Sequence, residues 1–323
     1  MIYERLLRPF LFALDPETAH QFALACLRFT GPLCPRPTAR TSGVSAFGLN
    51  FKHRVGLAAG LDKNGVALPA WEALGFSFIE IGTVTAQAQP GNPRPRIFRY
   101  PKQNALINRL GFNNDGAKII ANRLAQVRER GRWPGIPVGI NIGKSRVTPI
   151  ERAVEDYLFS FRKLRAYADY IALNISSPNT PGLRELHAGE RLDSLLRGIN
   201  TERGKLPLLV KIAPDLEPAA LDEVIRVSEA NNVSGVIATN TTLDHSGITP
   251  DEEGGLSGAP LQKKSTAIIR HIAQKTKIPV IGCGGILDRE SAREKVEAGA
   301  HLLQIYTGFI YRGPNLIREL ATL

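Results

Sequence analysis

A cluster of hydroxyl and carboxamide side chains follows an apolar run near the middle of the chain. The run is Tyr170-Ile171-Ala172-Leu173, and the cluster is Asn174-Ile175-Ser176-Ser177-Pro178-Asn179-Thr180. The run predicts a buried strand, and Pro178 cannot continue a central strand, so the polar side chains lie where the strand becomes a loop. Their donors and acceptors suit a planar polar ligand with amide-like edges. The same residue types also favour an ordinary turn, so the rest of the chain must decide.

Short apolar segments alternate with longer helix-like segments from residue 55 onward. The predicted strands are Val55–Leu61, Phe78–Val84, Pro137–Ile142, Tyr170–Ile175, Leu208–Ile212, Gly235–Thr239, Pro279–Cys283 and Leu302–Tyr306. The predicted helices between them include Asp115–Gly131, Pro149–Ala166, Pro218–Asn231 and Leu261–Thr276. Eight strands alternating with helices predict an α/β protein with a (β/α)8 TIM barrel, and a doubly wound open sheet is the alternative.

The carboxyl ends of these strands carry polar or small residues, and in a barrel those ends carry the chemistry. The ends of the first six strands include Lys, Asn or Thr, and the last two are followed by Gly284-Gly285 and Thr307-Gly308, where barrels commonly bind phosphate. Residues 254–258 (GGLSG) predict a second, flexible backbone cradle. No GxGxxG follows a strand, which argues against a nicotinamide site. FMN fits this pattern, with its ring edges at Asn141, Asn174 and Thr239 and with Lys211 stabilising the reduced ring.

Two regions stand apart from the repeating pattern. Between Pro90 and Asn114, the segments 96–100 and 105–108 predict a β-hairpin inserted over one mouth of the barrel. Residues 1–30 predict two short amphipathic helices, the second with Asp15 as N-cap. They either lie in a bilayer interface or pack on the main domain. Residues 32–50 have a linker composition, so a boundary near residue 40 divides the chain into residues 1–40 and 41–323.

The composition limits the classes of function. The three cysteines are scattered without metal-like spacing, which predicts no metal site and a reducing compartment. The net charge of +11 suggests an anionic partner or an anionic surface; the alternative is that the charge serves only solubility. Because the basic residues form no tract, we expect no nucleic-acid partner. The chain has no run of eighteen apolar residues and no signal peptide, so no membrane span is predicted.

Ordered motifs along nearly the whole chain resemble those of dihydroorotate dehydrogenase, in its class 2, quinone-reducing and membrane-associated form. The motifs are DPETAH (15–20), AAGLDKNG (58–65), EIGTVT (80–85), GNPRPRIFR (91–99), INRLGFNN (107–114), NIGK (141–144), NISSPNTPGLR (174–184), VKIAPD (210–215), IATNTT (237–242), GGLSG (254–258), GCGGI (282–286) and QIYTGF (304–309).

The resemblance implies roles for individual residues. It implies FMN contacts at Ala59, Gly60, Leu61, Asp62, Lys63, Thr83, Asn141, Asn174, Lys211, Thr239, Gly258, Gly285, Tyr306 and Thr307. It implies dihydroorotate contacts at Lys63, Asn108, Arg109, Leu110, Gly111, Phe112, Asn174, Asn179, Asn240 and Thr241. Ser177 matches the catalytic base, a position that class 1 enzymes fill with cysteine.

The implied reaction is oxidation of (S)-dihydroorotate to orotate in de novo pyrimidine (UMP) biosynthesis, with FMN as hydride acceptor and a membrane quinone as final electron acceptor. Serine is a poor base, so water or a relay through Thr180 must assist it. Lys63 offsets the substrate carboxylate and the developing enolate charge; the alternative is an ion pair with Asp62.

The resemblance also implies a role for the N-terminal helices, an apolar entrance for the quinone with His20, Arg99 and Tyr306 around its head group. The positive charge then attracts anionic lipid, and we expect a peripheral protein, a monomer, on the cytoplasmic face of a bacterial inner membrane. The rival hypotheses are another flavin barrel oxidoreductase, such as a class 1 or dihydropyrimidine enzyme, a Schiff-base lyase using Lys63 or Lys211, and a basic nucleic-acid-binding protein.

Overall fold

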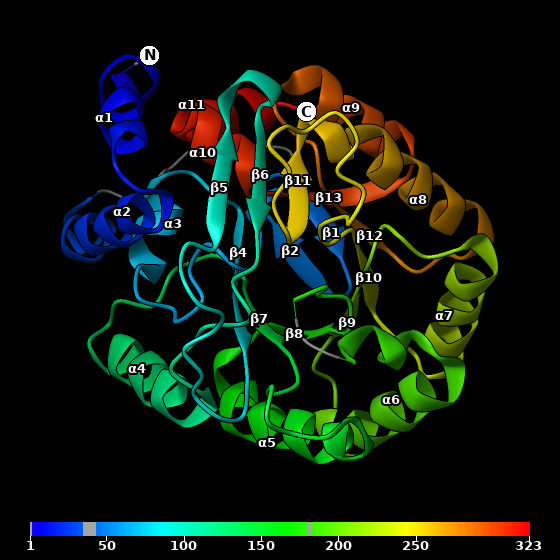
Figure 1. The fold of residues 1–323 in the computed structure, drawn as a ribbon. Helices are drawn as coiled ribbons and strands as arrows, with labels where there is room; N and C mark the ends of the chain where they lie inside the picture. The colour runs from blue at the N-terminus through cyan, green and yellow to red at the C-terminus, as the bar shows by residue number, and fades with distance from the viewer. Residues whose placement is uncertain (1, 35–42, 180–181) are drawn as a thin grey trace.

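Eight parallel strands close into a barrel in the computed structural model, which describes residues 2–34, 43–179 and 182–323 (Figure 1). Around the barrel the strands follow chain order, and β13 pairs with β3 to close it. They are β3 (Val55–Leu57), β4 (Phe78–Val84), β7 (Val138–Ile142), β8 (Tyr170–Asn174), β9 (Leu208–Ile212), β10 (Gly235–Ala238), β12 (Val280–Cys283) and β13 (Ala300–Ile305). Nearly every strand residue is buried, because side chains fill the barrel and helices cover it. The predicted (β/α)8 barrel is confirmed.

Helices surround the barrel and separate its strands. They are α3 (Leu68–Ala73), α4 (Ala117–Glu129), α5 (Ala153–Leu164), α6 (Gly189–Arg203), α7 (Pro218–Ala230), α8 (Gln262–Lys275), α9 (Arg289–Glu297), α10 (Thr307–Arg312) and α11 (Pro314–Leu320). Short helical turns are η2 (Gly31–Leu33), η3 (Pro101–Gln103), η4 (Ile150–Arg152), η5 (Arg165–Tyr167), η6 (Leu183–His187) and η7 (Ala259–Leu261).

The first barrel strand, β3, ends at Leu57, earlier than predicted. The reason is that the Asp62 carboxylate accepts the N–H groups of Val66 and Ala67 and so holds residues 58–67 in a loop.

A three-stranded antiparallel sheet lies over the barrel mouth (Figure 1). Two of its strands, β5 (Ile97–Tyr100) and β6 (Ala105–Asn108), form the predicted hairpin. The third is β11 (Gly255–Gly258), which pairs with β6. Residues 255–258 are therefore a paired strand rather than a flexible loop, and Ser257 and Gly258 line a cavity at the barrel mouth. Glycine is needed there for close packing, since a Cβ on Gly258 would lie 2.1 Å from the Asn104 carbonyl oxygen.

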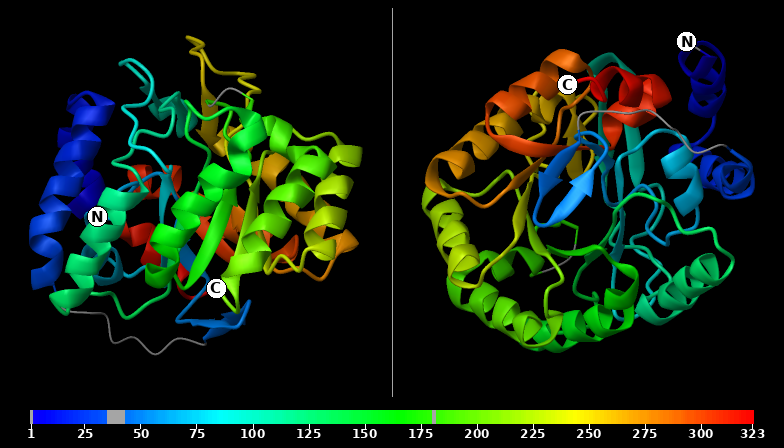
Figure 2. Two further views of the ribbon diagram at one scale, coloured as in Figure 1. Left: turned by 90° about the horizontal axis from the view of Figure 1, so that it is seen from below. Right: turned by 180° about the vertical axis from the view of Figure 1, so that it is seen from behind.

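A second hairpin covers the opposite end of the barrel, formed by β1 (Val44–Ala46) and β2 (Leu49–Phe51) (Figure 2). Its Phe51 is buried, with its ring centroid 5.2 Å from that of Phe78. The linker prediction is wrong for residues 44–50, because they belong to this hairpin, whose apolar side chains close the floor of the barrel. The boundary predicted near residue 40 lies outside the described residues.

The N-terminal helices η1 (Tyr3–Leu7), α1 (Arg8–Ala13) and α2 (Pro16–Thr30) lie along one side of the barrel (Figure 2). The carboxylate of Asp15 accepts the N–H groups of Glu17 and Thr18 at 3.0 Å, which confirms the predicted N-cap. Tyr3 donates to the carbonyl of Ile310, and Arg312 binds Glu4. One face therefore packs on the barrel domain. Large apolar side chains remain exposed on Ile2, Leu6, Leu7, Phe10, Phe22, Phe29 and Leu33.

Candidate active site

A cavity opens where the carboxyl ends of the barrel strands meet β6 and β11. Most of the side chains predicted for FMN or substrate line it. They are Ala59, Gly60, Lys63, Thr83, Asn108, Leu110, Gly111, Phe112, Asn174, Ser177, Asn179, Lys211, Thr239, Asn240, Thr241, Gly258, Gly285, Tyr306 and Thr307. Residues separated by more than two hundred positions in the chain thus converge on one cavity.

Four of the residues predicted for FMN or substrate do not line this cavity. Asp62 is fully buried and accepts bonds from the loop backbone and from the Trp71 indole, so its carboxylate holds the loop that carries Lys63. Asn141 is fully buried and contacts the cavity wall through Thr83. Arg109 binds Glu252 at 3.1 Å, and Leu61 lines a different, apolar cavity.

The cavity wall fits a flavin mononucleotide in three respects. The glycines at 284 and 285 approach helix α8 so closely that a Cβ on Gly285 would lie 2.3 Å from the Cα of Gln262, which leaves backbone N–H groups accessible to a phosphate. Lys211 is 5% exposed, lines the cavity and has no hydrogen-bond or ion-pair partner among the described residues. The Oε1 atom of Gln304 is buried at the cavity wall and lacks a partner within the same residues. An anionic phosphate and a polar ring would satisfy these groups.

Ser177 is nearly buried, and its Oγ accepts the backbone N–H of Asn179 at 3.2 Å. The Asn179 carboxamide donates to the carbonyl oxygen of Asn108 at 3.1 Å, which ties this loop to β6. Among the described residues, no carboxylate or imidazole contacts Ser177. His187, in the same loop, turns its Nδ1 to the carbonyl of Arg184 and does not line the cavity. The predicted relay residue Thr180 lies outside the described residues.

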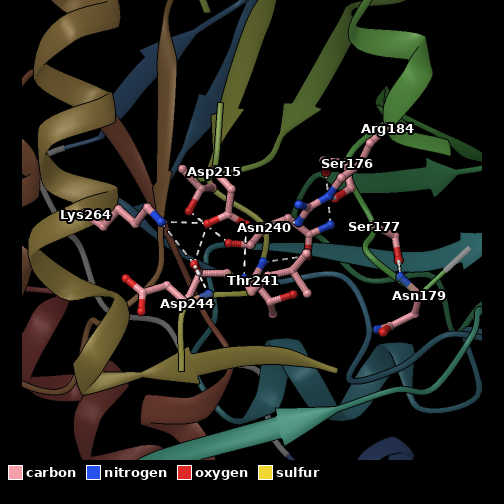
Figure 3. A network of polar contacts seen from close by, with 12 residues as sticks. Ser176, Ser177, Asn179, Arg184, Asp215, Asn240, Thr241, Asp244 and Lys264 are labelled. Atoms are coloured by element: carbon pink, nitrogen blue, oxygen red, sulfur yellow. Dashed lines mark hydrogen bonds and ion pairs between the residues drawn. The ribbon is translucent and has the colours of Figure 1, made fainter. Parts of the chain in front are cut away.

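The carboxylate of Asp215 joins the segments that carry Ser177, Asn240 and Thr241 (Figure 3). Arg184 donates both to Asp215, at 3.1 Å, and to the carbonyl of Ser176. Thr242 and Lys264 donate to Asp215 at 2.5 and 2.7 Å. Burial opposes ionisation, but the bonds from Lys264 and Thr242 lower the pKa of Asp215 below its usual range. Asp215 does not line the cavity, so it can only hold the residues that do.

Replacing Asp215 with asparagine should therefore slow the reduction of bound flavin by substrate about tenfold, because an amide cannot satisfy all these donors. The rate is measured by stopped-flow absorbance, with the reoxidation of flavin by quinone measured separately. Asp222→Asn is the matched control, since Asp222 also binds two side chains, His271 and Lys275, but away from the cavity. Equal losses in both variants, or in both half-reactions, would contradict a role for Asp215 in positioning the loop that carries Ser177.

Lys63 lies at the edge of the cavity, and its Nζ donates to the carbonyl of Gly60 at 3.0 Å. The alternative of an ion pair with Asp62 is wrong, because the Asp62 carboxylate is occupied by three other donors. Burial, with the nearby Arg96, lowers the pKa of Lys63 to about 8. The ammonium form is therefore retained at pH 7 and is lost as the pH rises through about 8.

This pKa predicts a pH dependence for the binding of an anionic ligand. Above pH 8, the affinity for a carboxylate such as orotate should fall by up to about tenfold per pH unit as Lys63 loses its proton. Titration of the flavin absorbance with orotate between pH 6 and 10 measures it. Lys63→Met should bind weakly at all pH values and lack this dependence. A wild-type affinity that stays constant to pH 10 would contradict the assignment.

A second, apolar cavity of about 540 Å³ lies between the N-terminal helices and the barrel, and His20, Arg99 and Tyr306 all line it. His20 Nε2 lies 2.6 Å from the carbonyl oxygen of Leu61, and burial together with Lys63 lowers the His20 pKa, which keeps the ring neutral. Arg99 donates to the carbonyls of Leu11 and Leu14. Tyr306 lines both cavities, and burial raises its pKa to about 12.

Several residues that support the site were missed in the sequence. Glu80 and Gln304 had a detectable signal, since each is a polar residue between two large apolar residues of a predicted strand. Asp215, Lys264 and Arg184 had none, because charged residues in loops and helices are usually solvated.

The family Dihydroorotate dehydrogenase matches residues 42–322 of this chain. A dihydroorotate dehydrogenase (quinone) from Gloeobacter violaceus is 51% identical, over 98% of this chain and 92% of that protein. Another of the same name from Salinispora arenicola is 51% identical over 99% and 98%. Among solved structures, the Eimeria tenella DHODH in complex with ferulenol is similar with a TM-score of 0.88 and 34% identity, over 95% of this chain and 90% of that one.

Proposed function

This chain belongs to the dihydroorotate dehydrogenase family, and from that premise we propose that the cavity at the barrel mouth is where Ser177 deprotonates dihydroorotate beside FMN. The enzyme oxidises dihydroorotate to orotate in pyrimidine biosynthesis, with FMN as cofactor and a quinone as the final electron acceptor. The observation that carries the proposal is the convergence of Ser177, Lys63 and Lys211 on one cavity.

The chain's own residues bind the substrate and remove its proton. The ammonium group of Lys63 neutralises the substrate carboxylate and the charge that develops on the ring as the proton leaves. Asn108, Asn179 and Asn240 line the same cavity and orient the substrate ring by hydrogen bonds. Ser177 Oγ takes the proton from the carbon next to a carbonyl while its own proton passes on toward solvent.

The glycines and the threonine after β12 and β13 would hold FMN, with Lys211 and Thr239 at its polar edges. When bound, FMN would supply an acceptor for the hydride that leaves the carbon adjacent to the deprotonated one. Among the described residues, Tyr306 lines both cavities and lies between the polar substrate site and the apolar cavity.

The quinone binds in the apolar cavity, near His20 and Arg99, and enters between the N-terminal helices. Residues 1–40 then form an entrance module and residues 41–323 the catalytic domain. The exposed apolar side chains of η1, α1 and α2 support docking of this module on a membrane surface, since exposed apolar patches mark interaction sites. None of the described helices is long and apolar enough to cross a bilayer. We place the enzyme as a peripheral monomer on the cytoplasmic face of a bacterial membrane.

The direct test is spectroscopic. The purified protein should be yellow, anaerobic dihydroorotate should bleach it, and a soluble quinone should restore the colour. A protein that stays colourless after incubation with FMN, or a bound flavin that dihydroorotate does not bleach, would contradict the proposal. Borohydride trapping of substrate on Lys63 or Lys211 would favour the lyase hypothesis instead.

A further inference from the structure

Glu80 is a fully buried carboxylate within barrel strand β4. Three side chains converge on its two oxygens: Asn141 Nδ2 lies 2.9 Å from Oε1, and Tyr170 Oη and Gln304 Nε2 lie 2.9 and 2.7 Å from Oε2. Burial and the Glu80 charge raise the pKa of Tyr170 well above its usual value of 10, so the phenol keeps its proton and donates. Glu80 therefore acts only as an acceptor.

A chain of hydrogen bonds runs from this carboxylate to the wall of the substrate cavity. Asn141 donates to Glu80, so its Oδ1 faces away and accepts the Thr83 hydroxyl at 2.7 Å. The Thr83 oxygen in turn accepts Asn174 Nδ2 at 2.8 Å. Asn174 Oδ1 then accepts Asn240 Nδ2 at 3.3 Å. In each of these hydrogen bonds one side chain donates and the next accepts, so the orientation of each side chain fixes that of its neighbour.

The far end of the chain is fixed independently by backbone groups that can only donate. The N–H of Ser176 donates to Asn174 Oδ1 at 3.2 Å, and the N–H of Thr241 donates to Asn240 Oδ1 at 2.8 Å. These two backbone donors require the same orientations of the Asn174 and Asn240 carboxamides as the chain of bonds from Glu80 does. Only one direction of donation satisfies all the groups in this chain of hydrogen bonds.

This direction of donation decides what the cavity offers a ligand. A carboxamide nitrogen carries two hydrogens, and Asn174 uses one of them within the chain, so its second N–H is available at the cavity that it lines. The carboxamide oxygens of Asn174 and Asn240 are both occupied by backbone donors. Dihydroorotate presents two ring carbonyl oxygens and a carboxylate, which need donors, and only two ring N–H groups, which need acceptors. The opposite orientation would present carbonyl oxygens to these acceptors.

We propose that Glu80 is a positioning residue that sets the orientation of the Asn141, Asn174 and Asn240 carboxamides and so makes the cavity a donor site selective for an oxygen-rich anionic ring. It never touches substrate and acts through the side chains between. The inference rests on the proposed substrate site, but the orientation of the chain can be tested without substrate.

The isosteric variant Glu80→Gln replaces one of the two acceptor oxygens with a donor. With the new amide nitrogen toward Asn141, two nitrogen donors face each other, and Asn141 can avoid this only by rotating, which passes the mismatch to Thr83 and Asn174. With that nitrogen toward Gln304, the Gln304 amide must turn to accept it, and the turned amide places a donor instead of its Oε1 acceptor at the cavity wall. We expect the dissociation constant of orotate, measured by flavin difference spectra, to rise about tenfold. The melting temperature should also fall.

The decisive variant is the double replacement Glu80→Gln with Asn141→Asp. The aspartate introduced at position 141 accepts from the glutamine introduced at position 80 on one oxygen and from Thr83 on the other. The hydrogen bonds from Thr83, Asn174 and Asn240 thus keep their wild-type directions, with the same net charge and nearly the same shape. Asn141→Asp alone places two carboxylates face to face and should be the least stable. We expect the double variant to melt above both single variants and to bind orotate more tightly than Glu80→Gln.

Glu72→Gln is the control for loss of a buried carboxylate. Glu72 is 2% exposed in α3, binds the N–H of Gly135 and does not line the cavity. It should change the melting temperature but not orotate affinity. Additive destabilisation in the double variant, with no recovery, would overturn the proposal, as would unchanged orotate affinity in Glu80→Gln. If the wild type binds no orotate, the proposed function fails, while the melting temperatures still test the orientation of the chain.

Discussion

Replacing Ser177 with alanine should slow the reduction of bound flavin by dihydroorotate by about two to four orders of magnitude, the usual contribution of a general base. The fold should be preserved, because within the described part of the chain Ser177 Oγ makes one hydrogen bond, accepting the half-buried N–H of Asn179. The rate is measured anaerobically in a single turnover by the loss of oxidised-flavin absorbance.

The same preparation contains its own control. Flavin reduced chemically in the Ser177→Ala variant should be reoxidised by quinone at the wild-type rate, because the apolar cavity does not include Ser177. Orotate should bind within a fewfold of wild type, since Lys63 and the asparagines remain. An unchanged rate of flavin reduction would show that another group removes the proton.

Replacing Ala23 with tryptophan should reduce quinone turnover at least tenfold while dihydroorotate still reduces the flavin at the wild-type rate. Ala23 is a half-buried residue of α2 whose side chain lines the apolar cavity, so an indole there occupies space that the quinone needs. Steady-state quinone turnover and the single-turnover reduction of flavin are measured on the same sample.

Ala25→Trp is the matched control on the same helix, since Ala25 is exposed and does not line the cavity. It should leave turnover with a soluble quinone unchanged. Similar losses in both variants would mean that the helix, rather than the cavity, is disturbed. Deleting residues 1–30 would not separate these causes, because the deletion removes Glu17 and leaves its buried partner Arg96 without a counter-charge next to Lys63.

The residue types at the strand ends were sufficient to predict where the site lies. Parallel strands of a closed barrel all point the same way, so side chains at their carboxyl ends must meet at one rim. Asn174, Lys211 and Thr239 could therefore be assigned to one cavity without coordinates. The cap of α2 was predictable for a similar reason, since Asp15-Pro16 is a local signal that needs no tertiary partner.

Other features depended on pairings between distant segments. β11 is a strand only because β6 lies beside it, and the hairpin of residues 44–51 is ordered by packing on Phe78 and Tyr170. Neither partner is visible in the local pattern, so GGLSG and the proline-rich stretch before residue 50 favoured loops.

By itself, the sequence determined the barrel, the polar rim and the identities of the groups that carry the chemistry, because strand periodicity and residue type are local properties. The tertiary structure alone decided the direction of the hydrogen bonds and the protonation of the charged groups. A carboxamide has no preferred orientation, and the pKa of Lys63 is not shifted to about 8, until neighbours from other strands and helices surround them. The donors and charges that the cavity presents are therefore properties of the assembled fold.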